Sequence, residues 1–135
     1  MAEEAAKVSG VAKVLLVESG AYENFLAENI ATLVSNISGD YDFILAPTTT
    51  NGKNVMPRVA ALQDVSQISD ISAIESSDTF QRPIYAGNCI ATVKSNDSKK
   101  IITVRNTAFD AADASGGSAE TVSYTHLTLP TNREV

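Results

Sequence analysis

The feature that most constrains the fold is an alternation of apolar runs and amphipathic segments in the first half of the chain. Val11–Val17 and Tyr41–Ala46 are short runs rich in β-branched residues and leucine, as in strands. Ala27–Ile37 and Val55–Leu62 repeat apolar residues every three or four positions, as in helices. With a helix end at Glu3–Val8, this order predicts right-handed parallel βαβ units in an open, layered α/β sheet.

Local signals add detail to these elements. Val11–Val17 is expected to be buried on both faces, as strands of parallel sheets are. Pro57 is placed early in the second amphipathic helix, where a missing N–H costs little. Thr50 or Asn51 is expected to cap that helix, and Gly52 to permit a tight turn.

After Asp64 the pattern changes to short strand-like runs without helical periodicity. These runs are Ile68–Ile74, Ile84–Ala86, Cys89–Lys94 and Lys100–Arg105. The polar segment 95–99 separates the last two and predicts a hairpin loop between them. The sheet should therefore be mostly parallel, with an antiparallel hairpin extension.

The composition along the chain predicts three regions. Residues 1–112 should form a partial N-terminal α/β domain, and residues 113–121 are small and polar, as in an interdomain linker. Residues 122–131 resemble the translation of a sequencing adapter, so residues 122–135 are predicted to be a disordered scar, which would contain His126, the only histidine. A genuine disordered terminus is the alternative.

Composition and charge exclude several classes of function. The chain has 135 residues, 44% of them hydrophobic and 19% charged, which fits one globular domain. Its net charge is −6 and its basic residues do not cluster, so no nucleic-acid partner is expected. No apolar run reaches the roughly 20 residues of a membrane span, so no membrane insertion is expected. Cys89, the only cysteine, is predicted to be a core residue, in a chain without a disulfide or a cysteine-based metal site.

The segment Thr48–Asn54 lies where a strand leads into a helix, a position at which free N–H groups can bind phosphate. It lacks the spacing of a phosphate-binding loop, because Asn54 stands where a hydroxyl residue would follow Gly52-Lys53. The position of this segment leaves a stand-alone adenine-nucleotide-binding module as the alternative function. The missing spacing favours the structural explanation, in which these residues cap the helix.

Three charged residues are further candidates. Arg58 and Arg82 could bind a carboxylate or phosphate, although solvated arginines have the same appearance in a sequence. Asp70 lies in a strand-like run, and a capped or salt-bridged role is favoured over that of a hydrolytic acid because no partner residue is evident. We find no catalytic constellation and no metal-ligand motif, so the chain is not expected to be an enzyme.

Several blocks of sequence resemble the N-terminal domain of the electron transfer flavoprotein alpha subunit, in the order and spacing of that family. The resemblance covers about residues 2–121 and is carried by Ala6–Leu15, Gly52–Ala61, Gln67–Ile71, Thr79-Phe80, Arg82–Asn88, Val104-Arg105 and Phe109–Ala112. It implies a Rossmann-like, adenine nucleotide alpha hydrolase-like layered domain that is incomplete at its N-terminus.

The resemblance also implies a function. Family members pair with a beta subunit, which holds AMP, and pass electrons from flavin dehydrogenases, such as acyl-CoA dehydrogenases, to a quinone reductase. FAD is bound mainly by a C-terminal domain with a Ser-Gly-Gly-Arg-Gly stretch, so no cofactor-binding position is expected in this sequence. The implied compartment is the bacterial cytoplasm or the mitochondrial matrix. The matching polar positions are expected to be scaffold and subunit-interface residues: Lys53, Asn54, Arg58, Asp70, Arg82, Tyr85, Gly87 and Asn88.

Overall fold

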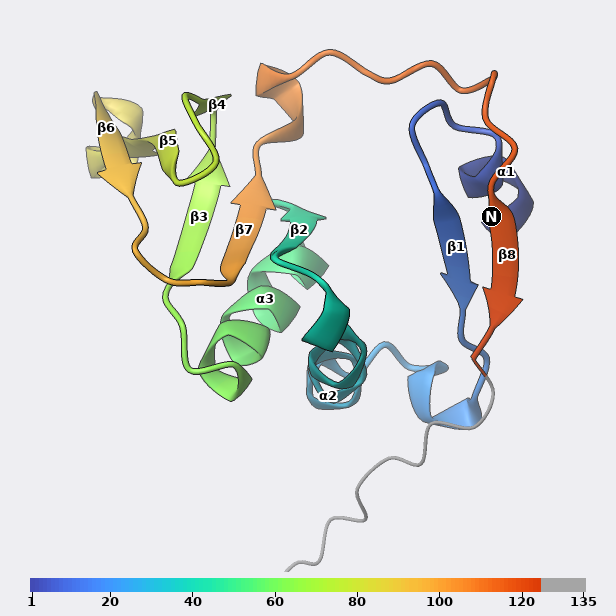
Figure 1. The fold of residues 1–135 in the computed structure, drawn as a ribbon. Coiled ribbons are helices and arrows are strands. Elements are labelled where there is room, and N and C mark those ends of the chain that lie inside the picture. The colour runs from blue at the N-terminus through green and yellow to red at the C-terminus, as the bar shows by residue number, and fades with distance from the viewer. Residues whose placement is uncertain (125–135) are drawn as a thin grey trace, which may run out of the picture. The chain divides into compact units, whose positions relative to one another are not determined.

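The computed structural model describes residues 1–124, which form two compact units that we treat separately (Figure 1). Among the described residues, one unit contains residues 1–24 and 110–124, and the other contains Phe25–Phe109. Both contain parallel strands, and the second unit adds an antiparallel sheet. The predicted α/β class with mostly parallel strands and an antiparallel extension is therefore confirmed.

In the first unit, the short helix α1 (Ala2–Ala6) is followed by strand β1 (Lys13–Leu16) and the 3₁₀ helix η1 (Gly20–Tyr22). β1 pairs in parallel with β8 (Glu120–Ser123), from Lys13 opposite Glu120 to Leu16 opposite Ser123. Lys13 is exposed and the rest of β1 is only half-buried. The prediction that this strand is buried on both faces is wrong, because within its unit it has one neighbouring strand.

The segment predicted to be a linker is held to the N-terminal segment by backbone hydrogen bonds. Gly117 N–H donates to the Lys7 carbonyl over 2.8 Å, and Ala119 N–H donates to the Ala6 carbonyl over 3.0 Å. β8 then includes Val122 and Ser123, the first residues of the predicted scar. The remainder of that scar from residue 125, with His126, lies outside the described residues, and the proposed domain boundaries stay a prediction.

The second unit contains most of the secondary structure. Its sheets have the orders β2-β7-β3, all parallel, and β4-β5-β6, all antiparallel. Its elements are α2 (Ala27–Ile37), η2 (Ser38–Asp40), β2 (Phe43–Pro47), α3 (Thr50–Leu62), β3 (Gln67–Ile71), β4 (Ala73–Ile74), β5 (Thr79–Ile84), η3 (Tyr85–Gly87), β6 (Cys89–Lys94), β7 (Lys100–Val104) and η4 (Asn106–Ala108).

Two clusters of buried side chains hold this unit together. On the helical side, Ala31 of α2 and Val59 of α3 pack with Ile101 of β7. On the other side, Phe80 of the antiparallel sheet packs with Ile71 of β3 and Ile102 of β7. Because β7 supplies consecutive residues to opposite clusters, it is the central strand, as its continuous apolar sequence requires.

The predicted hairpin at residues 95–99 is wrong. β6 pairs with β5, and the segment 95–99 instead leads from the antiparallel sheet to β7 in the parallel sheet. Ile101 and Ile102 explain the difference, since both are buried and an outer hairpin strand would expose one of them. Lys99 in this connection donates hydrogen bonds to the carbonyls of Ser38 and Tyr41, beyond the C-terminal end of α2.

Helix α3 begins earlier than the apolar pattern indicates. Thr49 is its N-cap, in place of the predicted Thr50 or Asn51, and Pro57 consequently lies inside the helix and not near its start. Pro57 has no N–H to donate to the carbonyl four residues earlier. The first turn of α3, from Thr50 to Lys53, contains no apolar side chain, so the apolar spacing of the sequence does not predict that the helix extends to it.

Candidate functional site

Polar side chains gather where the parallel strands of the second unit end. Thr48 directly follows β2, Asp70 lies near the end of β3, and Arg105 directly follows β7. The carboxyl ends of parallel strands meet at one edge of a sheet, and this edge is where open α/β sheets bind ligands. We call Thr48, Asp70, Thr103 and Arg105 the carboxyl-edge cluster.

A bulge in β3 positions Asp70. Ile68 pairs with Ile102 and Ile71 pairs with Val104, so β3 has one more residue than β7 between these pairs. Asp70 has φ 58°, in the left-handed region, and its N–H donates to Thr103 Oγ1 over 2.8 Å. Aspartate adopts this conformation more readily than most residues do, which helps to explain its presence here.

Asp70 and Arg105 form an ion pair with two hydrogen bonds. Arg105 Nε lies 3.1 Å and Nη2 lies 2.5 Å from Asp70 Oδ2. The hydrogen bond and charge of Arg105 lower the pKa of Asp70 despite partial desolvation, and Thr48 and Lys53 contribute in the same direction. The pKa of Arg105 is raised by the same partner. Asp70 is therefore salt-bridged, as expected, and its lowered pKa makes it a poor general base.

The start of α3 lies at the same edge and is tightly built. Thr49 Oγ1 accepts a hydrogen bond from Gly52 N–H over 3.2 Å, and Lys53 N–H donates to the Thr49 carbonyl over 2.8 Å. A Cβ on Gly52 would lie 2.1 Å from the Pro47 oxygen. Because the chain itself uses these two N–H groups, neither is free to bind a phosphate at the start of α3.

An apolar cavity of about 330 Å³ lies beside this helix start. Thr49, Asn51 and Gly52 line one part of it, and aliphatic residues including Ile44 and Val55 line the rest. The cavity combines an apolar wall with a helix N-terminus.

The predicted site residues on α3 have separate surroundings. Lys53 is exposed but close enough to Asp70 to lower the pKa of that carboxyl group. Arg58 Nη2 lies 3.6 Å from Glu28 Oε1 on α2, and Arg58 Nε lies 3.5 Å from Asn54 Oδ1. Arg58 thus forms an exposed ion pair between α3 and α2, and its bond to Asn54 lies within α3.

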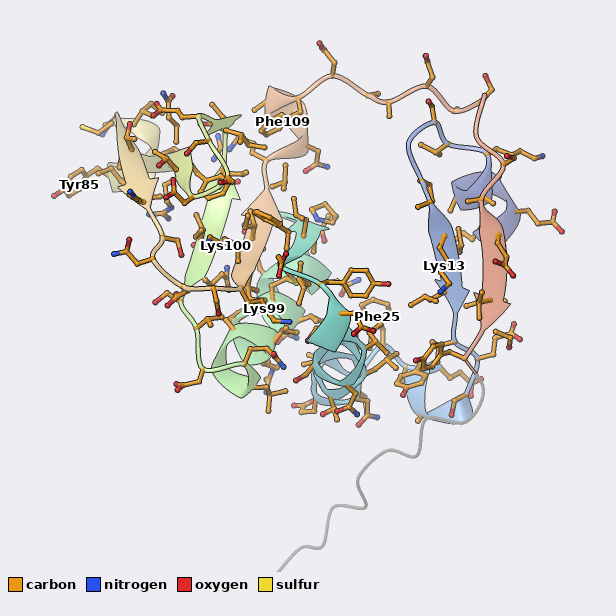
Figure 2. All side chains as sticks on the ribbon, in the orientation of Figure 1. Lys13, Phe25, Tyr85, Lys99, Lys100 and Phe109 are labelled. Carbon is orange, nitrogen blue, oxygen red and sulfur yellow. The ribbon has the colours of Figure 1, made fainter. Side chains whose placement is uncertain are left out.

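The remaining predicted residues lie on the antiparallel sheet. Arg82 of β5 donates from Nε to the Ser69 carbonyl of β3 over 2.8 Å. Tyr85, Gly87 and Asn88 form the turn between β5 and β6, and the Tyr85 side chain extends away from the sheet (Figure 2). Cys89 follows this turn and is exposed, so its prediction as a core residue is wrong.

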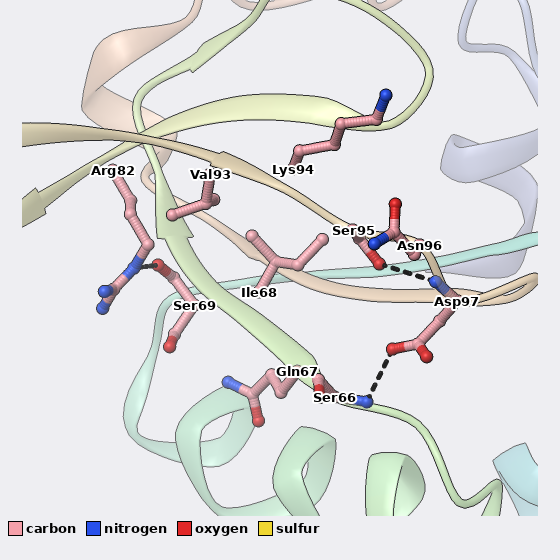
Figure 3. Close-up of a pocket in the computed structure, with 10 residues that line it drawn as sticks. All are labelled: Ser66, Gln67, Ile68, Ser69, Arg82, Val93, Lys94, Ser95, Asn96 and Asp97. Atoms are coloured by element: carbon pink, nitrogen blue, oxygen red, sulfur yellow. Dashed lines mark hydrogen bonds between the residues drawn. The ribbon is translucent and has the colours of Figure 1, made fainter.

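A second, polar pocket of about 420 Å³ lies between the start of β3 and the antiparallel sheet (Figure 3). Ile68 and Val93 are its apolar residues, and Arg82, Lys94 and Asp97 are its charged ones. Ser66 N–H donates to Asp97 Oδ2 over 3.0 Å. We call this cavity the polar pocket.

Sequence reasoning did not single out Arg105, Thr103 or Asp97. Arg105 had one available signal, since it follows an apolar run that ends at the sheet edge. Thr103 and Asp97 had none, because their partners are 33 and 31 residues away in the chain. Among residues 1–124 no group of His, Cys, Asp and Glu could hold a metal ion. A search of the same residues for a helix of membrane-spanning length and hydropathy found none.

Comparison with known proteins extends these observations. The family model described as electron transfer flavoprotein domain matches residues 1–128. The chain is 59% identical over 119 residues to electron transfer flavoprotein subunit alpha of Pseudomonas aeruginosa, which covers 88% of this chain and 38% of that protein. It is 59% identical over 115 residues to the subunit of the same name from Paracoccus denitrificans, covering 85% of this chain and 37% of the relative.

A mitochondrial relative is similar as well. Over 137 aligned residues the chain is 49% identical to the mitochondrial electron transfer flavoprotein subunit alpha of Dictyostelium discoideum, covering 96% of this chain and 39% of the relative. The chain spans less than two fifths of the length of these three relatives. The relatives thus include both bacterial and mitochondrial proteins.

Proposed function

Because the chain belongs to the electron transfer flavoprotein domain family and is similar to its alpha subunits, we propose that it is the scaffold that binds the beta subunit. The observation that carries this proposal is the 59% identity to an alpha subunit over 88% of the chain. In this function the chain contributes no catalytic residue and serves an electron carrier, not an enzyme. The carrier would pass electrons from flavin dehydrogenases to a quinone reductase.

The turn between β5 and β6 is the part of the proposed interface with the most unusual geometry. Tyr85, Ala86 and Gly87 all have φ between 49° and 88°, and the Tyr85 side chain is 76% exposed. Left-handed conformations cost of order 1–3 kcal/mol for residues other than glycine and are often found at functional sites. An exposed tyrosine on such a turn is suited to be an interface hot spot, because tyrosine is enriched among them.

Helix α3 supplies the other predicted interface residues. Lys53, Asn54 and Arg58 are all exposed, and they extend from the first turn of the helix to its middle. Asp70 and Arg82 differ from them, since each is half-buried and bonded within the unit. We propose that Lys53, Asn54 and Arg58 contact the partner and that Asp70 and Arg82 maintain the scaffold.

Association with a beta subunit tests the proposal. The full chain would be mixed with a purified electron transfer flavoprotein beta subunit, and the dissociation constant measured by calorimetry. Tyr85→Ser should weaken binding by about tenfold or more, because hot-spot truncations cost over 1–2 kcal/mol. Tyr41→Ser, at a tyrosine that is 46% exposed and directly follows η2, is the matched control and should have no effect. Absence of binding by the unaltered chain would contradict the proposal.

The flavin is proposed to be bound by parts of the alpha subunit beyond those matched here, and AMP by the beta subunit. This is in keeping with the two N–H groups at the start of α3 that are not free to bind a phosphate. FAD added to the full chain should leave its absorption and fluorescence spectra unchanged. Tight, stoichiometric binding of FAD to the chain alone would overturn this part of the proposal.

A stand-alone adenine-nucleotide-binding module is a second candidate, favoured by the apolar cavity beside the start of α3. An adenine ring would occupy the cavity, and its phosphates would lie near Lys53. Calorimetry with AMP and ATP distinguishes the two functions. A heat of nucleotide binding that is present with the unaltered chain and lost in Lys53→Gln would support the module. If the unaltered chain gives no heat of binding with AMP or ATP, the module is excluded.

A further inference from the structure

The polar pocket carries two opposite charges at separate ends. In Figure 3, Arg82 and Asp97 lie on opposite sides of the pocket, with Ile68 and Val93 between them. Arg82 is bonded to the Ser69 carbonyl and Asp97 to the Ser66 N–H, three residues apart on the chain that enters β3. Three residues of extended chain correspond to roughly 10 Å. The two charges are thus too far apart to neutralise each other directly.

Arg82 is held by one hydrogen bond and keeps further N–H donors for a ligand. Its Nε is used by the Ser69 carbonyl, which fixes the plane of the guanidinium group. Among the described residues, its two terminal nitrogens have no hydrogen-bond or ion-pair partner. A guanidinium group oriented in this way is suited to bind a carboxylate with two parallel hydrogen bonds.

Asp97 is held in a similar way at the other end. Its Oδ2 accepts the Ser66 N–H, and its own N–H donates to Ser95 Oγ over 3.3 Å. Lys100 donates to the backbone carbonyl of Asp97 and not to its carboxylate. Within residues 1–124 the carboxylate has no ion-pair partner, so it remains able to bind a cation from a ligand.

The balance of charge decides which ligand fits. Lys94, the other cation of the pocket, lies 3.4 Å from Asp78 Oδ2 and is already paired. One free guanidinium group suits a carboxylate, with its single charge, better than a phosphate carrying nearly two, which Asp97 would also repel. The carboxylate of Asp97 in turn suits an ammonium group. A ligand with both groups, separated by several bonds, matches both ends of the pocket.

We propose that the polar pocket binds a zwitterionic ligand that presents a carboxylate to Arg82 and an ammonium group to Asp97. The ligand spans the apolar floor of Ile68 and Val93 with its aliphatic part. Such a pair of groups can come from a free amino acid whose ammonium and carboxylate groups are at opposite ends of an aliphatic chain. It can also come from an acidic and a basic side chain two residues apart in a bound polypeptide. Side chains two residues apart lie on the same face of an extended strand.

Nuclear magnetic resonance titration of the full, ¹⁵N-labelled chain tests the proposal. The probes are 6-aminohexanoate for the free source and the blocked tripeptide acetyl-Glu-Ser-Lys-amide for the polypeptide source. Resonances of Ser66–Ser69 and Ser95–Asp97 should shift with at least one probe, and the tighter probe identifies the source. Hexanoate and hexylamine, which each lack one charge, should bind at least tenfold more weakly than 6-aminohexanoate, as should glycine, whose charges are too close together.

Substitutions complete the test. Arg82→Gln and Asp97→Asn should each weaken the better probe at least tenfold, whereas Arg58→Gln, at an exposed arginine outside the pocket, should leave it unchanged. The comparison among probes needs no substitution and so remains decisive if a variant misfolds. The proposal is overturned if neither probe shifts these resonances at millimolar concentration, or if hexanoate or hexylamine binds as well as the zwitterion. It does not depend on the proposed function, because no beta subunit is present.

Discussion

Arg105 and Asp70 join the ends of two neighbouring strands, with two guanidinium nitrogens on one carboxylate oxygen. The pKa of Asp70 is lowered on folding, so the pair stabilises the fold above the ordinary pKa of 3.8 and loses this effect as the pH falls through the lower, folded value. The difference in melting temperature between the wild-type chain and Asp70→Asn should therefore be constant from about pH 7 to 5 and shrink below about pH 4. Calorimetric melting at several pH values measures it.

Asp40→Asn is the control for this experiment, because Asp40 is exposed and forms no ion pair within the described residues. Its melting temperature should follow that of the wild-type chain at every pH. A constant offset between Asp70→Asn and the wild type down to pH 2 would show that the ion pair does not stabilise the fold.

The backbone at Asp70 should matter separately from its charge. Asp70→Asn and Asp70→Ala both remove the carboxylate, but alanine at φ 58° also carries the cost of the left-handed conformation. Asp70→Ala should be less stable than Asp70→Asn by about 1–2 kcal/mol, measured by urea unfolding. Asp70→Gly, which lacks a Cβ, should recover part of that loss. Equal stability of the alanine and asparagine variants would argue against a left-handed residue at this position.

Gly52 should tolerate no side chain. A Cβ there would lie 2.1 Å from the Pro47 oxygen, so Gly52→Ala must displace the first turn of α3. Overpacking of this kind costs about 1–3 kcal/mol, and chemical denaturation would measure it. Gly39→Ala is the matched control, since no atom lies within 4 Å of its added Cβ. If the two variants were equally stable, the close approach of β2 to α3 would be disproved.

Phe80 should contribute more to stability than any exposed apolar residue of its sheet. It is 2% exposed and packs against Ile71 and Ile102. Phe80→Ala should lower the free energy of unfolding by about 3–5 kcal/mol. Ile90→Ala, at a side chain that is 58% exposed, should change it by less than about 0.5 kcal/mol. Urea unfolding of both variants tests this contrast, which a small effect of Phe80→Ala would contradict.

Asp78 should have a lowered pKa because of the side chains that contact its carboxyl group. The hydroxyl groups of Thr79 and Ser76 lower its pKa to about 2, with a smaller contribution from the charge of Lys94. Thr79→Val should raise this pKa more than Lys94→Gln does, because the hydrogen bond is the larger cause. Titration of the Asp78 carboxyl resonance by nuclear magnetic resonance measures both changes. A larger shift in Lys94→Gln would assign the lowered pKa to the ion pair instead.

The sequence predicted those features that depend on local periodicity. The bounds predicted for the first amphipathic helix, Ala27–Ile37, are those of α2, because its apolar spacing coincides with the helical period. The strand-like run Cys89–Lys94 likewise has the bounds of β6. Neighbouring residues alone determine both patterns, so no knowledge of the rest of the fold was needed.

Pairing and the candidate site depended on contacts that no local pattern contains. The polar segment 95–99 has the composition of a hairpin loop, and only the burial of Ile101 on the far side of the sheet reveals that it is a crossover. Asp70 was recognised as a candidate, but Arg105 lies 35 residues away and its side chain reaches Asp70 only because β3 and β7 are adjacent. A bulge in β3, which composition does not indicate, completes the geometry.

The bond from Arg82 to the Ser69 carbonyl has a mechanical consequence. It fastens the middle of β5 to β3, while the backbone of Ser72 is bonded to Gln81 and Phe80 fills the space between the two sheets. These contacts hold the antiparallel sheet against β3 and oppose any movement of one sheet away from the other. A force applied at the turn between β5 and β6 is therefore expected to be transmitted through β5 to β3 and the other parallel strands.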